Sequence, residues 1–411
     1  MAESFDVVIV GGGIVGLSTA MAMLDRAPGL KLAVLEKERA VAAHQTGHNS
    51  GVIHSGVYYK PGSLKAHLCV RGAAAMKAFC REQGLPHEIC GKVIVATSDA
   101  ERGPLAELHR RAQANGVPGV EMIGPERLRE IEPHAAGVAA MLVPGTGIVD
   151  FGAVARRYAE IIASRGGEVR LGARVTGIHN SAAELRVLTE AGELSACYLV
   201  NCAGLHSDRV ARMTGSTLDL KIVPFRGEYY ELAPERRHLV KTLIYPVPDP
   251  RFPFLGVHFT KRVTGGVEAG PNAVLALKRE GYRKSDISLH DAAEALAFSG
   301  FRRMARRYWR NAAEEYYRSF SKAAFVRGLQ KLVPEIRAED LHPGGSGVRA
   351  QAIESSGALV DDFRFVTADR IIHVLNVPSP AATASLPIGE AIADMGKEWF
   401  QSLGHRASVH N

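Results

Sequence analysis

A glycine-rich turn near the start of the chain constrains the fold more than any other sequence feature. Gly11, Gly13 and Gly16 fit the spacing G-x-G-x-x-G, and they lie between an apolar, β-branched run (residues 5–10) and an Ala/Met/Leu-rich segment (residues 17–24). The run is typical of a buried parallel strand, and the segment is typical of a helix. Because the helix would begin at the glycines, its N-terminal amides would face an anionic group there.

A carboxylate completes this motif. Glu36 follows a second apolar run, residues 30–35, twenty residues after Gly16. In a β-α-β unit this spacing places the carboxylate beside an adenosine ribose, where it accepts hydrogen bonds from hydroxyls and repels a 2′-phosphate. The sequence therefore predicts a site for NAD or FAD, and we expect Ile14, Val15 and Lys37 to contribute to it.

A polar stretch after the second predicted strand favours FAD over NAD. Residues 44–59 (HQTGHNSGVIHSGVYY) are small and polar and have no core periodicity, where a nicotinamide enzyme would begin its crossover helix. Such a stretch supplies backbone amides and small side chains beyond the pyrophosphate, which suits a flavin. We expect it to contribute Thr46, His48, Asn49, Ser50 and Gly51 to the cofactor site.

The rest of the chain predicts an α/β fold in which a Rossmann-type FAD-binding domain is interleaved with an antiparallel-sheet α+β substrate domain. Helices are expected over residues 71–83, 102–115, 154–165 and 387–403, and strands over 92–96, 168–171, 185–187, 197–201 and 371–374. Residues 223–264 alternate like antiparallel strands, with a hairpin turn at Gly265-Gly266. The expected FAD-binding domain comprises residues 1–85, 145–215 and 335–411. The expected substrate domain comprises residues 86–144 and 216–334, with a basic helical region over 286–332.

Composition excludes several classes of protein. The 411 residues carry 50 Lys and Arg against 43 Asp and Glu, a net charge of +7. This excess suits an anionic substrate, cofactor or membrane surface, and it is too diffuse to predict a nucleic-acid partner. Five cysteines without a C-x-x-C pair predict reduced thiols and no metal site. We find no membrane-spanning run and no signal peptide, and therefore expect a cytoplasmic protein.

Seven strings between His44 and Gly389 carry a resemblance to a known family, and this resemblance extends over residues 7–392. They are HQTGHNSGVIHSGVYY from His44, VPGTGIVD from Val143, PFRGEYYEL from Pro224, YPVPDPRFPFLGVHFT from Tyr245, VEAGPNAVLALKREGY from Val267, GVRAQAI from Gly347 and NVPSPAATASLPIG from Asn376. A chain with these strings resembles the FAD-dependent D-amino-acid-oxidase-like (glycine/sarcosine oxidase-like) superfamily. More narrowly, it resembles the L-2-hydroxyglutarate oxidase/dehydrogenase family.

The resemblance implies a cofactor, a reaction and further contacts. The cofactor is FAD, and the reaction is oxidation of L-2-hydroxyglutarate to 2-oxoglutarate by hydride transfer to flavin N5, with electrons passed to a quinone or to oxygen. Val175 would contact the adenine through its backbone, and Ala203 and Gly204 would lie near the phosphates. Backbone amides of the C-terminal loop would hold the flavin pyrimidine oxygen, at Ser379, Pro380, Ala381, Ala382 and Thr383.

Oxidation of a 2-hydroxy acid also needs a cation for the C1 carboxylate and a base for the hydroxyl proton. We expect Arg349 to bind the carboxylate, because its Gly-x-Arg context resembles that of amino-acid-oxidising relatives, although Ala350 replaces their proline. His54, within the flavin-proximal stretch, is the expected base, and His258 is its rival. Candidates for the distal carboxylate are Arg226, Tyr58, Tyr59, Lys278 and Arg279. The alternatives are a flavin oxidase of another 2-hydroxy acid or of an amino acid, and a non-catalytic FAD-binding protein.

A basic segment suggests a second kind of contact. Arginines at 302, 303, 306, 307 and 310 recur at helical spacing among aromatic residues. On a helix, one face would be cationic and another aromatic, which suits peripheral contact with the anionic inner face of the cell membrane. The alternative is a helical insertion whose aromatic residues pack on the second domain while its arginines are solvated.

Overall fold

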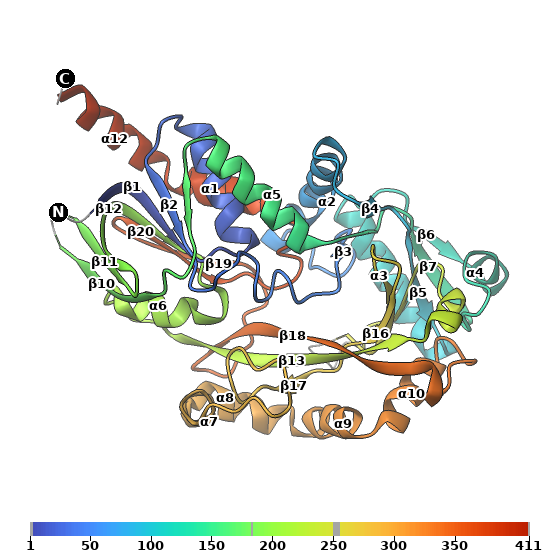
Figure 1. Ribbon diagram of the computed structural model, residues 1–411. Helices are drawn as coiled ribbons and strands as arrows, with labels where there is room; N and C mark the ends of the chain where they lie inside the picture. The colour runs from blue at the N-terminus through green and yellow to red at the C-terminus, as the bar shows by residue number, and fades with distance from the viewer. Residues whose placement is uncertain (1–2, 182–183, 250–254, 410–411) are drawn as a thin grey trace.

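The computed structural model describes residues 3–181, 184–249 and 255–409 and contains two large sheets (Figure 1). Pro250 and Pro253, which lie in the proline-punctuated predicted sheet, fall outside the described residues. The chain crosses between the two sheets several times, so each sheet is built from segments that are far apart in the sequence.

The first sheet contains the predicted β-α-β unit. Its central strand β1 pairs in parallel with β2 and β12, and β12 pairs in parallel with β20. The strands are β1 (Glu3–Val10), β2 (Leu32–Leu35), β9 (Glu168–Arg170), β10 (Val175–Asn180), β11 (Leu185–Thr189), β12 (Gly192–Asn201), β19 (Arg364–Ala368) and β20 (Ile371–Asn376). Side chains alternate along β1, so Val7 and Ile9 pack against one layer of helices while Val8 and Val10 pack on the other face. Both faces are therefore buried, as the apolar run predicts.

Helices cover both faces of this sheet. They are α1 (Ile14–Arg26), α2 (Leu64–Glu82), α5 (Phe151–Ser164), α11 (Ser385–Met395) and α12 (Lys397–Val409), with α6 (Ser207–Met213) on the opposite face. The core between α1, α5 and α11 includes Leu17, Val154 and Ile388. Three short strands, β3 (Val52–Ile53), β4 (His87–Glu88) and β8 (Gly147–Val149), form a third sheet.

The second sheet is antiparallel except for the parallel pair β5–β14. Its strands are β5 (Lys92–Ala96), β6 (Glu121–Ile123), β7 (Ala139–Val143), β13 (Leu220–Leu232), β14 (Leu243–Pro246), β15 (His258–Lys261), β16 (Val267–Gly270), β17 (Val274–Leu275) and β18 (Leu341–Glu354). Its helices are α3 (Arg102–Ala114), α4 (Pro125–Ile131), α7 (Leu289–Ala297), α8 (Ser299–Arg307), α9 (Trp309–Phe320) and α10 (Lys322–Gln330).

Strand alternation decides what each face of the second sheet contacts. Val93 and Val95 of β5 pack toward Phe325 of α10, whereas Ile94 and Ala96 pack toward α3. The hairpin at Gly265-Gly266 joins β15 to β16, as predicted, with Gly265 at φ +89°. The expected domain division places residues 335–411 in the cofactor domain, but β18 pairs along its length with β13 and belongs to the second sheet.

Candidate active site

A cavity of about 1340 Å³ lies between the two large sheets. Its walls come from the ends of three first-sheet strands, at Val10, Leu35 and Cys202, and from His258 and Arg349 of the second sheet. Ligands of open α/β sheets bind outside the carboxyl ends of the parallel strands. The cavity therefore lies where the glycine motif predicts a cofactor.

The cavity brings together most of the predicted site residues. It is lined by Gly11, Gly13, Ile14, Val15, Glu36, Lys37, Thr46, His48, Asn49, Ser50, His54, Tyr58, Tyr59, Val175, Ala203, Gly204, His258, Arg349, Ser379, Pro380, Ala381, Ala382 and Thr383. Of the described residues predicted for the site, Gly16, Gly51, Arg226, Lys278 and Arg279 do not line it.

The glycine turn has no room for side chains. Gly11 has φ +114°, and a Cβ atom there would lie 2.4 Å from the carbonyl oxygen of Cys202. A Cβ atom on Gly16 would lie 2.0 Å from the carbonyl oxygen of Gly11. Gly16 thus allows close packing of α1 on β1 without lining the cavity, and Gly11 and Gly13 present bare backbone to it.

Glu36 is fixed by the backbone around it. Its side chain is buried, and its two carboxylate oxygens accept hydrogen bonds from the amides of Gly12 (2.8 Å) and Glu38 (2.9 Å). The next residue, Lys37, also lines the cavity, and its ammonium contacts Glu280 (2.9 Å) and His44 (2.8 Å). The carboxylate is therefore held at the end of β2, where the motif places a ribose.

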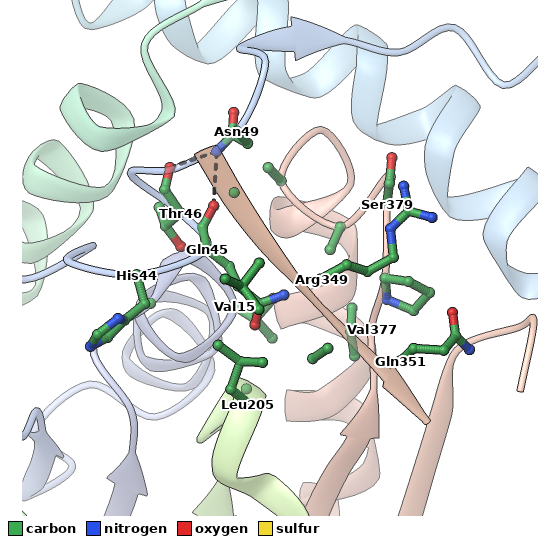
Figure 2. A pocket seen from close by; sticks show the side chains of 18 of the residues that line it. Val15, His44, Gln45, Thr46, Asn49, Leu205, Arg349, Gln351, Val377 and Ser379 are labelled. Atoms are coloured by element: carbon green, nitrogen blue, oxygen red, sulfur yellow. Dashed lines mark hydrogen bonds between the residues drawn. The ribbon is translucent and has the colours of Figure 1, made fainter. Parts of the chain in front are cut away.

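The polar stretch folds over the start of α1. Thr46 Oγ1 accepts a hydrogen bond from the amide of Ile14 (3.0 Å), and the Asn49 side chain donates to the carbonyls of Gln45 and Thr46 (Figure 2). Asn49 also accepts from the amide of Gly51 (2.8 Å), which has φ +70°. Gly51 thus shapes the turn without lining the cavity.

The C-terminal loop closes the cavity beside this stretch. Thr383 Oγ1 accepts a hydrogen bond from the amide of His54 (3.0 Å) and donates to the carbonyl of Val52 (3.1 Å). Ser379 Oγ lies 3.4 Å from His54 Nε2. The cavity-lining residues of this loop, Ser379 to Thr383, come directly before α11, which begins at Ser385.

These residues fit FAD. The bare glycine turn at a helix N-terminus suits a pyrophosphate, and the fixed carboxylate of Glu36 suits a ribose. The cavity is larger than a typical small-molecule pocket and extends to polar groups of both sheets. Among the residues that line the cavity, His54 and Tyr58 each have a buried atom, Nδ1 and Oη, without a hydrogen-bond partner among the described residues.

Two histidines and several tyrosines meet at the second-sheet wall. His258 Nδ1 lies 2.8 Å from the carbonyl oxygen of Gly256, so this nitrogen carries the proton and Nε2 is left as an acceptor. The His258 ring packs against Tyr245 in a tilted arrangement, with 3.9 Å between the ring centroids. Tyr58, Tyr59 and Tyr229 also line this end.

Both histidines are held in the neutral form. Burial lowers the pKa of His54 to about 3, and the charges of Lys92 and Arg349 act in the same direction. Burial lowers the pKa of His258 to about 4, with the same two cations contributing. Each imidazole is therefore a proton acceptor at neutral pH.

Arg349 projects from β18 toward the loop that carries Ser379 (Figure 2). It pairs with Phe225 across the β13–β18 ladder, and both residues line the cavity. The guanidinium is accessible through the cavity. Its planar donors match a carboxylate in bidentate geometry.

Arg226 does not have the predicted orientation. Phe225 and Gly227 line the cavity, but Arg226, between them on the strand, does not. Its guanidinium instead forms an ion pair with Glu228 (3.0 Å) and donates to the carbonyl of Arg283 (3.1 Å). The structure thus argues against a substrate role, because a strand turns successive side chains to opposite faces.

Lys278 and Arg279 are also outside the cavity. Lys278 is exposed. Arg279, also a candidate for the distal carboxylate, is buried and forms ion pairs with Asp208 and Glu294. These contacts join the loop before α7 to α6, so Arg279 has a structural role.

Sequence reasoning missed residues that reach the site across the second sheet. Tyr229 and Tyr245 line the cavity, and Lys92 lies directly behind Tyr58 and Tyr245. Alternation along the strands was the signal that could have identified these residues, because strand 92–96, which begins at Lys92, was predicted correctly. Which face would meet the cofactor was not encoded locally.

The fold and the cavity define a flavin-dependent oxidoreductase. The model of the FAD dependent oxidoreductase family matches residues 6–395, and the chain belongs to this family. Solved structures with the same fold include L-α-glycerophosphate oxidase from Mycoplasma pneumoniae with FAD bound (TM-score 0.77, 21% identity, 95% of this chain and 94% of that one). Glycine oxidase from Geobacillus kaustophilus is another (TM-score 0.73, 19% identity, 96% and 95%).

More similar sequences carry one name. The chain is 52% identical to the L-2-hydroxyglutarate dehydrogenase of Indibacter alkaliphilus, over 96% of this chain and 100% of that protein. It is 49% identical to the Escherichia coli K12 enzyme of the same name (94% and 92%) and 47% identical to the human mitochondrial one (97% and 90%). The predicted family and the predicted FAD cofactor are thereby confirmed.

Proposed function

We propose that the protein oxidises L-2-hydroxyglutarate to 2-oxoglutarate. The assignment of the substrate rests on the near full-length similarity of this chain to L-2-hydroxyglutarate dehydrogenases. The reaction removes the hydroxyl proton and a hydride from C2. FAD, when bound, supplies the acceptor for that hydride at N5.

The chain's own residues hold the substrate and take the proton. Arg349 binds the C1 carboxylate, and this fixes C2 in the cavity. His54 lines the cavity, and its imidazole accepts the hydroxyl proton. His258 lies on the facing wall with Nε2 available, and it contributes to orienting the hydroxyl.

Arg226 and Lys278 do not line the cavity, so Tyr58 and Tyr59 remain as the candidates for binding the distal carboxylate. Burial raises the pKa of both phenols well above the usual value, so both stay protonated and act as donors. Tyr58 Oη has no partner among the described residues. A carboxylate oxygen beside it would satisfy this donor, which suits the second acid group of hydroxyglutarate.

Anaerobic mixing of the purified yellow protein with separate acids tests this proposal. We expect L-2-hydroxyglutarate to bleach the visible flavin absorbance, because the cavity binds a dicarboxylate and removes its C2 hydride. The D enantiomer, L-lactate, glycine and sarcosine serve as comparisons and should leave the flavin oxidised. Bleaching by sarcosine instead would identify an amine oxidase, and bleaching by none of them would indicate a non-catalytic flavoprotein.

We further propose that the basic helical region contacts the membrane, which would place the enzyme beside a quinone acceptor; oxygen is the alternative acceptor. No helix in the described part of the chain is long and apolar enough to cross a bilayer. Large apolar side chains are nevertheless exposed on α7 and α9: Leu289 (83%), Phe320 (76%) and Trp309 (60%). Figure 1 shows α7 to α9 on the side of β13 and β18 that is remote from the first sheet.

Cations accompany these exposed side chains. Arg306, Arg307 and Arg310 are exposed, and Arg310 lies 5.3 Å from the ring centroid of Trp309. By contrast, Phe301 and Met304 are buried, which is the packing expected of an ordinary helical insertion. The exposed aromatic and cationic side chains together suit the headgroup region of an anionic leaflet.

Co-sedimentation of the holoenzyme with vesicles of mixed neutral and anionic phospholipid checks this contact. We expect binding at low salt that weakens as salt rises and that is lost when Arg306, Arg307 and Arg310 are changed to Glu. A matched control reverses three exposed arginines of α3 and α4, Arg110, Arg127 and Arg129, and should still sediment. Recovery of the wild-type protein in the supernatant at every salt concentration would contradict membrane contact.

A further inference from the structure

Lys92 is a buried cation directly behind the substrate end of the cavity. It is the first residue of β5 and is completely buried, with 0% exposure. It pairs with Leu243 of β14 and Val143 of β7, so its side chain lies on the same face of the sheet as Tyr245. Because Ile244 pairs with Phe259, His258 also lies on this face.

The surroundings of Lys92 contain no counter-ion in the described part of the chain. Its Nζ lies 4.6 Å from the ring centroid of Tyr58 and 5.0 Å from that of Tyr245. It has no hydrogen-bond partner among the described residues. The other titratable groups that face it are His54, His258 and the Cys69 thiol.

A buried ammonium without a partner opposes folding, because cation–π contacts replace only part of the lost hydration. Methionine is nearly as long and carries no charge, so stability alone would favour it here. The charge itself is therefore the feature that needs explaining, and it lies behind the wall formed by Tyr58 and Tyr245.

We propose that Lys92 is a positioning residue for the oxidation, whose buried charge stabilises a doubly anionic substrate in the cavity. This inference rests on the proposed function, because a dicarboxylate is the ligand that would need a second cation besides Arg349. Lys92 does not line the cavity, so it acts across the tyrosine ring and not by direct contact.

The charge state of Lys92 then couples substrate binding to pH. Burial lowers the pKa of Lys92 to about 7, and a dianion nearby would raise it again. Above pH 7, Lys92 must take up a proton when the substrate binds. Substrate affinity should therefore fall as pH rises above 7. Below 7 the ammonium is present before the substrate arrives, and it lowers the pKa of His54 and His258.

Lys92→Met tests the inference in the FAD-loaded enzyme. In anaerobic stopped-flow reduction, we expect the substrate concentration at half-maximal rate to increase tenfold or more at pH 6.5. We also expect it to lose the rise with pH that the wild type shows above pH 7. The low-pH limb of the reduction rate should move to higher pH, because the histidines regain basicity. Lys77→Met is the matched control: Lys77 lies on α2 outside the cavity, and burial also lowers its pKa.

Thermal unfolding supplies a readout that does not depend on activity. Lys92→Met should melt above the wild type below pH 7, and this difference should shrink toward pH 10, where an unfolded lysine also loses its proton. A variant with wild-type substrate affinity and pH profile, or one that melts lower with the profile unchanged, would show that Lys92 is structural. Lys92→Gln replaces it if the methionine variant does not fold. If the flavin of the wild type does not bleach, the proposed function is refuted. If Lys92→Met bleaches with the substrate affinity and pH profile of the wild type, only this inference is refuted.

Discussion

Replacing Arg349 with alanine is expected to lower kcat/KM for L-2-hydroxyglutarate by on the order of a hundredfold or more. The C1 carboxylate would enter the cavity without its bidentate partner, and an unpaired buried charge costs a few kcal/mol. KM should rise steeply, and kcat should fall as well, because C2 is no longer fixed. Steady-state kinetics of the flavin-loaded variant provide the measurement.

Two other substitutions sharpen the Arg349 experiment. Arg349→Lys retains the charge without the planar donors, so it should recover only part of the lost kcat/KM. Arg226→Ala removes a buried arginine from the adjacent strand, where it forms an ion pair with Glu228 and does not line the cavity. It should lower thermal stability and leave KM near the wild-type value. A wild-type kcat/KM in Arg349→Ala would exclude Arg349 from the site.

Replacing His54 with alanine is expected to slow flavin reduction by about 10² to 10⁴-fold while FAD remains bound. The loss follows from removal of the proton acceptor, since the pKa of His54, lowered to about 3, keeps it neutral across the working range. Single-turnover reduction under anaerobic conditions measures this step apart from reoxidation. The flavin-to-protein ratio confirms that the cofactor site is intact.

His258→Ala is the matched variant, because both histidines line the same end of the cavity. Its Nδ1 is committed to the Gly256 carbonyl, so its loss should weaken substrate orientation and slow reduction less. Added imidazole should partly restore the His54 variant. If His258→Ala alone shows the large loss, the two roles must be exchanged.

Local sequence patterns predicted the elements that contain the site. The β1–α1–β2 unit and the strand Lys92–Ala96 follow from composition and period. Helix starts were less accurate: α2 begins at Leu64 because Ser63 caps it, and α5 begins at Phe151 because Asp150 caps it. The single predicted helix over 387–403 is divided at Gly396 into α11 and α12.

The site was predictable where it depends on chain-local motifs. The glycine turn, Glu36 and the stretch after His44 line the cavity as expected, apart from residues that shape turns. The failures came from pairing between strands. The side on which Arg226 points and the approach of Lys92 to Tyr58 depend on the arrangement of β5, β13 and β14, and local periodicity does not specify that arrangement.

The order of the strands has a consequence for how the protein folds during its synthesis on the ribosome. The cofactor cradle begins at residue 11, yet β1 pairs with β12, and α1 packs on α11 so closely that a Cβ atom on Gly389 would lie 2.5 Å from the Ser18 carbonyl oxygen. Contacts this distant in sequence form late, after long loops have closed. β1 and β2 can pair soon after they are made, whereas β1 gains its partner β12 only after residue 201, and the apolar face of α1 is covered only once α11 is made. The cavity, which is lined by residues from both ends of the chain, is therefore complete only once residues 379–383 have been synthesised.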